Sequence, residues 1–171
     1  MKNQDKTALY ESATKNILAQ INKMNLSPED KNKAVYYTSF FREAFKYDVI
    51  KQKTFLTRGN KIWNFGYDSA GFCYASSSVF SVIMGLDDWN LMCIDADKWP
   101  GRFSHHYLKH VPSGTFFDLT YDQFSVDGFS VPYELGERVF VHLDKKDSPM
   151  RFAKALDIDV MGILQGKVKA I

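Results

Sequence analysis

Cys73 combines a nucleophilic side chain with a position that the sequence marks as the start of a helix. The residues before it, 66–71, have the composition of a loop. Residues 73–84 contain neither Pro nor Gly and carry apolar side chains at helical spacing, and Gly85 is placed to end the helix. Unpaired N–H groups at a helix start favour a thiolate, and a nearby cation lowers the pKa of such a cysteine to about 3.5–7.5. The sequence therefore indicates a nucleophilic thiol, the alternative being a small, buried, unreactive side chain.

A hairpin downstream supplies partners for this thiol. Residues 103–111 and 115–120 have the pattern of two strands, joined by Pro112-Ser113-Gly114. Pro and Ser in a type I turn, followed by Gly in the left-handed conformation, predict a three-residue loop. In this register Val111 pairs with Thr115, Leu108 with Asp118, and His106 with Thr120.

The predicted register brings a histidine and a carboxylate together. Because side chains alternate along a strand, His106 and Asp118 share a face as diagonal neighbours, roughly 7–8 Å apart at the backbone. His105 is expected to point to the other face. A two-residue Ser-Gly turn would reverse this choice, but Ser is a poor fit for the positive φ that such a turn requires. An imidazolium beside a thiolate, with a carboxylate to orient the ring, is the arrangement that a thiol acyl-transfer enzyme needs. We therefore predict Cys73 as the nucleophile, His106 as the general base and acid, and Asp118 as the orienting carboxylate.

The tetrahedral intermediate of such a reaction needs donors for its oxyanion. The backbone N–H of Cys73 is one, and a second is expected from the preceding loop. The residue types present leave the second donor open among Asn64, Trp63 and Tyr67.

The same residues carry a resemblance to a known family. Gly71-x-Cys73-x-Ala75, then His106-Tyr107, then a Pro112-to-Phe124 segment resemble the YunG-like bacterial family and, more distantly, the transglutaminase-like branch of the papain fold. The last segment has the form Pro112-x-Gly114-Thr115-x-x-Asp118-Leu119-Thr120-x-x-Gln123-Phe124. The resemblance covers roughly residues 66–157 and implies a papain-like fold.

Two residues depart from this family pattern. Phe72 stands where the family has Gln, and Leu108 stands where it has Trp. The resemblance therefore does not extend to the substrate preference or to the oxyanion donors.

Two other functions compete with acyl transfer. A mixed zinc site is imaginable from His106, His110, Asp118 and Cys73, but no Cys-x-x-Cys or His-x-x-x-His pattern with Glu supports it. The second is a catalytically inert papain-like module that binds a protein partner and keeps these residues for packing.

Composition and length limit the number of domains, the classes of partner and the cellular compartment that we expect. A chain of 171 residues fits one domain, and its formal net charge of +2, with scattered basic residues, does not indicate nucleic-acid binding. The first residues lack the apolar core of a signal peptide, and no stretch is long enough to span a bilayer. We therefore expect a cytoplasmic protein with a protein or peptide-like substrate, no nucleic-acid or membrane partner, and neither cofactor nor metal. Its two cysteines, Cys73 and Cys93, are expected to be free thiols, with Cys93 structural.

The predicted class is α+β: a papain-like, transglutaminase-like domain whose antiparallel sheet packs on the cysteine-bearing helix. One domain over residues 1–171 is expected, with a helical N-terminal cover (1–56) and a papain-like core (57–157). The expected elements are helices over residues 6–24 and 28–47, the latter capped by Ser27, a helix over 73–84, strands over 89–94, 103–111, 115–120 and 138–143, and a helix from Ser148. Residues 48–56 are left open between an extended segment and a short helix. The basic residues of the cover are interpreted as a solvated face, the alternative being a weak patch for an anionic surface; they are Lys31, Lys33, Arg42, Lys46, Lys51 and Lys53.

Overall fold

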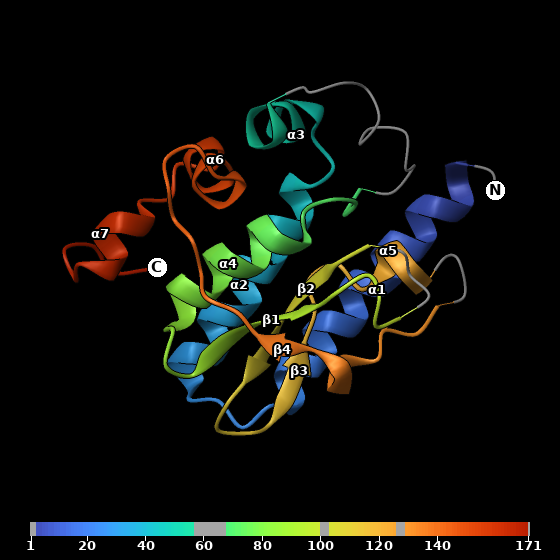
Figure 1. Cartoon of the computed structure of the whole chain (residues 1–171), viewed down its shortest axis with the longest axis horizontal. Helices are drawn as coiled ribbons and strands as arrows, with labels where there is room; N and C mark the ends of the chain where they lie inside the picture. Colours follow the sequence, from blue (N-terminus) through green and yellow to red (C-terminus); the bar gives the residue numbers. More distant parts are fainter. Residues whose placement is uncertain (1–2, 57–67, 100–102, 126–128, 171) are drawn as a thin grey trace.

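The computed structural model describes residues 3–56, 68–99, 103–125 and 129–170. Within these ranges the chain is α+β, with seven α-helices and one four-stranded antiparallel sheet of order β3-β2-β1-β4 (Figure 1). The helices are α1 (Asn3–Lys23), α2 (Pro28–Ala44), α3 (Asp48–Phe55), α4 (Cys73–Met84), α5 (Asp122–Ser125), α6 (Ser148–Ala155) and α7 (Val160–Leu164). The strands are β1 (Trp89–Ile94), β2 (His105–His110), β3 (Thr115–Phe117) and β4 (Glu137–Arg138), with a short 3-10 helix at Tyr133–Leu135.

No helix in these ranges has the length and apolar character needed to cross a bilayer.

Local signals place several elements where the sequence predicts them. The Ser27 hydroxyl accepts a hydrogen bond from the Asp30 N–H at 3.1 Å, and Pro28 occupies the first turn of α2. Residues 48–55 resolve as the helix α3. The strand expected over 138–143 is much shorter, because pairing with β1 ends near Val139, whose N–H donates to the Leu91 carbonyl at 2.9 Å.

Helix α4 lies at the centre of the molecule. It packs against β1 and β2 of the sheet and against α2, α6 and α7. All of its residues from Ala75 to Met84 are buried, which explains why its apolar pattern is so broad. Phe80, for example, packs between Phe41 of α2 and Trp89 of β1. Because α1, α2, α4 and the sheet share one hydrophobic cluster, the boundary between a cover (1–56) and a core (57–157) stays a prediction.

The opposite face of the sheet covers a second, smaller cluster. Its buried members are Met92, Ile94, Trp99, Tyr107 and Phe124. This cluster surrounds the end of β2 from which the candidate site is built.

The hairpin loop contains four residues, so the predicted register is wrong by one position. Leu108 pairs with Phe117, Lys109 with Phe116 and His110 with Thr115. Val111 belongs to the loop because its N–H donates to the Asp88 carbonyl at 2.8 Å, which extends the ladder between β1 and β2. Gly114 adopts the predicted left-handed conformation, with φ of 68°.

Candidate active site

Cys73 is the first residue of α4, and the two residues before it fix the start of the helix. Gly71 has φ of 79°, in the left-handed region that favours glycine. Phe72 is fully buried, with its ring centroid 4.4 Å from that of Phe45 and 5.4 Å from that of Phe152. This apolar contact anchors the first turn, while Cys73 itself is partly exposed. The thiol therefore lies at the positive end of a well-fixed helix dipole.

Two histidines contact this thiol. His105 and His106 are the first two residues of β2, and both rings lie beside the Cys73 side chain. Burial alone would raise the pKa of Cys73, but the polar contacts and the positive charge of the two rings outweigh it and lower the pKa to about 6. The thiol is therefore largely a thiolate at neutral pH.

The histidine that binds Asp118 is His105, and the prediction that His106 does so is wrong. His105 Nε2 lies 2.6 Å from Asp118 Oδ2, and both side chains are buried. The reason is the shifted register: moving a strand by one residue exchanges the side chains on its two faces. The diagonal relation inferred for His106 and Asp118 thus applies to His105 and Asp118.

Asp118 is held as a carboxylate by four hydrogen bonds. Its Oδ2 accepts from the Tyr133 hydroxyl at 3.0 Å as well as from His105. Its Oδ1 accepts from the Thr120 N–H at 2.8 Å and from the Thr120 hydroxyl at 3.1 Å. Burial raises the pKa of Asp118, but the charge of His105 and these hydrogen bonds lower it further, so the net shift is downward.

His105 is held as an imidazolium. Burial would lower its pKa, but the charge and hydrogen bond of Asp118, with a smaller effect from Cys73, raise the pKa to about 10. Since Nε2 binds Asp118, Nδ1 is the nitrogen available to the Cys73 thiol. Nδ1 is buried and makes no hydrogen bond within the part of the chain that the structure describes. The His105 cation therefore lies between the Cys73 thiolate and the Asp118 carboxylate.

His106 has different surroundings. It is partly exposed, and its ring lies beside that of Tyr74, with centroids 4.8 Å apart. Across the sheet it is directly opposite Cys93. Cys93 is a free thiol, and burial and the nearby Asp95 raise its pKa to about 11, which disfavours its thiolate.

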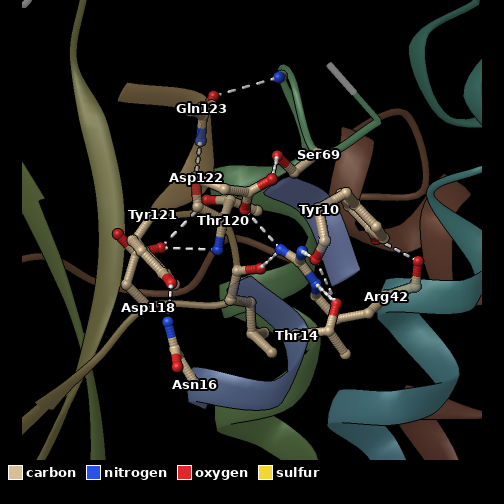
Figure 2. A network of polar contacts seen from close by, with 12 residues as sticks. Tyr10, Thr14, Asn16, Arg42, Ser69, Asp118, Thr120, Tyr121, Asp122 and Gln123 are labelled. Atoms are coloured by element: carbon tan, nitrogen blue, oxygen red, sulfur yellow. Dashed lines mark hydrogen bonds and ion pairs between the residues drawn. The ribbon is translucent and has the colours of Figure 1, made fainter. Parts of the chain in front are cut away.

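A buried arginine holds the segment that follows Asp118 (Figure 2). Arg42 of α2 is 1% exposed, so its interpretation as part of a solvated face is wrong. Its Nη1 donates to the Leu119 carbonyl at 2.9 Å and to Asp122 Oδ1 at 2.5 Å. Because Leu119 directly follows Asp118, this cation fixes the backbone next to the orienting carboxylate.

The same network reaches the loop before Cys73. Asp122 Oδ2 accepts a hydrogen bond from the Ser69 hydroxyl at 2.9 Å. The side chain of Gln123 accepts from the Gly71 N–H at 3.4 Å and donates to the Thr120 carbonyl at 3.1 Å. Figure 2 shows these contacts converging on the turn between Asp118 and α5. Asp122 and Gln123 therefore link the nucleophile loop to the segment that carries the carboxylate.

Removing one of these hydrogen bonds should raise the pKa of Cys73 and cost only a little stability. We expect Ser69→Ala to raise the pKa of Cys73 toward the ordinary value of about 8.5, because the loop before α4 loses its contact with Asp122. Ser81→Ala is the matched control: its hydroxyl donates to the Trp89 carbonyl at 2.6 Å and is equally buried, but it lies at the other end of α4. Each variant should lose about 1 kcal/mol of stability, measured by urea unfolding. An equal alkylation midpoint for Cys73 in both variants would contradict this role of Ser69.

Sequence reasoning missed most of the supporting residues. The predicted register puts His105 on the wrong face, and no local signal identifies Tyr133, Arg42 or Asp122. Thr120 and Gln123 lie in the Pro112-to-Phe124 segment, but the sequence alone predicts no role for them. The proposed oxyanion donors Trp63, Asn64 and Tyr67 lie outside the described residues. The backbone N–H of Cys73 remains a donor candidate, since the first N–H groups of a helix lack partners within it.

Among the residues that the structure describes, no group of three or more His, Cys, Asp or Glu side chains is arranged to hold a metal ion. Comparison of the chain with family models, curated proteins and solved structures gave no match.

Proposed function

We propose that this protein is a cysteine-dependent acyl-transfer enzyme that hydrolyses, deamidates or transamidates an amide or ester. Cys73 is the nucleophile, His105 is the cation that keeps it ionised, and Asp118 holds His105 in place. The observation that carries the proposal is the buried bond of 2.6 Å between Asp118 and His105, whose other ring nitrogen is available to a thiol at a helix start. The acyl donor we expect is a protein or a peptide-like molecule.

The geometry supports a two-step reaction. The Cys73 thiolate attacks the carbonyl carbon, and the carbonyl electrons move to oxygen, where the Cys73 N–H and the nearby imidazolium stabilise the oxyanion. Collapse of this intermediate breaks the bond to the leaving group and leaves a thioester on Cys73. An amine leaving group takes its proton from an imidazolium beside the thiol, whereas a nitrophenolate departs as the anion. Water or an amine then attacks the thioester, gives a proton to the imidazole and releases the thiolate.

The order of elements supports a papain-like, transglutaminase-like fold as part of the same proposal. The nucleophile begins a buried helix, and the histidine and the carboxylate follow on adjacent antiparallel strands or directly after them. Here His105 takes the place that the predicted register assigns to His106.

An activated ester tests the proposal directly. Incubation with p-nitrophenyl acetate should release p-nitrophenolate and add one acetyl group to Cys73, detected by intact mass and peptide mapping. Cys73→Ala should remove both signals, whereas Cys93→Ala should retain them. Absence of acetylation at Cys73 in the unaltered protein would overturn the proposal and favour an inert module that binds a protein partner.

A further inference from the structure

The two histidines that contact Cys73 differ in their access to solvent. His105 is 0% exposed, and the aromatic rings of Phe124, Tyr107 and Trp99 surround it, with centroids 4.7, 6.1 and 6.4 Å away. His106 is partly exposed, as is Cys73. Of the two rings beside the thiol, that of His106 is therefore the one that solvent reaches.

A proton-transfer group must touch molecules that arrive and leave. The leaving group and the acceptor both exchange with solvent, so each must approach the thiol where neighbouring residues are exposed. The ring of His105 is buried, with Asp118 at Nε2 and Cys73 on the side of Nδ1. Neither ring nitrogen is therefore left for a further partner. His106 lies on the opposite face of β2, beside the partly exposed ring of Tyr74, and still contacts the reacting sulfur.

We propose that His106 is the general acid and base that exchanges protons with the leaving group and the acceptor, while His105 and Asp118 act only as a buried charge pair. This division of roles rests on the proposed acyl-transfer function. It also explains why the site holds two histidines where one imidazole would suffice for a triad.

The proton balance is complete in both steps. In acylation, protonated His106 gives its proton to the leaving nitrogen or oxygen as the bond to the acyl carbon breaks. In deacylation, neutral His106 takes a proton from water or an amine as its oxygen or nitrogen attacks the thioester. The bond between carbon and sulfur then breaks, and the electron pair returns to Cys73 as the thiolate, which His105 stabilises.

The raised pKa of His105 agrees with this division. The charge of Asp118 is its largest favourable cause and stays in place after Cys73 is acylated. His105 is therefore expected to keep its proton through the cycle, as a charge stabiliser does and a proton shuttle does not.

Pre-steady-state kinetics with p-nitrophenyl acetate separate the two roles. The nitrophenolate leaves without a proton, so His106→Gln should retain the acylation burst, while turnover to water falls by about 100-fold. Hydroxylamine, a nucleophile that needs little base assistance, should restore much of this turnover. His105→Gln should lose the burst itself. His106→Asn serves as a second variant if the Gln variant does not fold.

Each outcome separates the inference from the proposed function. If the unaltered protein forms no acetyl-Cys73, the acyl-transfer function fails. If it does, and His106→Gln turns over at the original rate or loses burst and turnover together, the assignment of His106 as the proton-transfer group is overturned. Failure of hydroxylamine to increase turnover in His106→Gln would also overturn it.

Discussion

Iodoacetamide is expected to modify Cys73 at pH 6 about ten times faster than it modifies a free cysteine, and to leave Cys93 unmodified. A thiol with a pKa of about 6 is half ionised at that pH. A free cysteine, with a pKa of about 8.5, is ionised to well under about 1%. The lower intrinsic nucleophilicity of the more acidic thiolate offsets roughly a tenfold part of this advantage. The pKa of Cys93, raised to about 11, keeps that thiol protonated.

The rate of Cys73 modification should change with pH in the direction set by the lowered pKa of the thiol. As the pH falls through about 6 the Cys73 thiolate gains a proton, so the rate should decline; above that value the rate should level off. Peptide mapping at timed intervals from about pH 5 to about pH 9 measures both cysteines in one experiment. Cys73→Ser should leave no rapid modification.

Three variants test which side chains lower the pKa of Cys73. His105→Gln should move the midpoint toward the ordinary range, because His105 lowers the pKa of Cys73 more than His106 does. His106→Gln should move it less. Asp118→Asn should also raise it, since the charge of Asp118 keeps His105 protonated. A single midpoint near about 8.5 in the unaltered protein, the same in Asp118→Asn, would show that Cys73 is not activated.

The elements that position Cys73 were predictable because their signals are local. The start of α4 follows from a loop that ends in Gly71, and its length follows from an uninterrupted apolar pattern up to Gly85. The cap at Ser27 and the strand β1 are likewise determined by a few neighbouring residues. In each case the residues that determine the element lie within it or beside it.

The partner of Asp118 was not predictable in this way. Pro112-Ser113-Gly114 predicts a turn, but the number of loop residues depends on whether Val111 pairs with β3 or with the chain before β1. The hydrogen bond from Val111 to Asp88 decides this, and it joins segments that are distant in the sequence. A difference of one residue in the loop then exchanges His106 for His105.

Arg42 shows the same limit for a charged side chain. A basic residue on a predicted helix is usually solvated, and the sequence near Arg42 contains no partner that indicates otherwise. Its partner, Asp122, is 80 residues further along the chain. Only the packing of α2 against the segment after β3 brings the two charges together.

The burial of this ion pair predicts a large loss of stability when it is broken. Arg42→Met should lower the free energy of unfolding by about 3–5 kcal/mol, because Asp122 would keep its charge in the interior without its cation. The carbonyls of Leu119 and Tyr10 would also lose a donor. Urea unfolding followed by circular dichroism measures the change.

Lys46→Met is the matched control for this prediction. Lys46 lies just beyond the end of the helix that carries Arg42 and pairs with Glu43 at 2.8 Å, but its side chain is 40% exposed. An exposed ion pair contributes less than about 1 kcal/mol, so this variant should unfold almost as the unaltered protein does. Equal losses in the two variants would contradict a structural role for the buried pair.

The folded fraction of Arg42→Met should also show a raised alkylation midpoint for Cys73. Arg42 holds Asp122, and Asp122 holds Ser69 in the loop that leads to the nucleophile. If Arg42→Met does not fold, Asp122→Asn tests the same link, because it removes the charge and keeps an oxygen that can accept from Ser69. A stability loss without any shift in the Cys73 midpoint would confine Arg42 to holding the fold, whereas both changes together would make the buried ion pair a positioning element of the site.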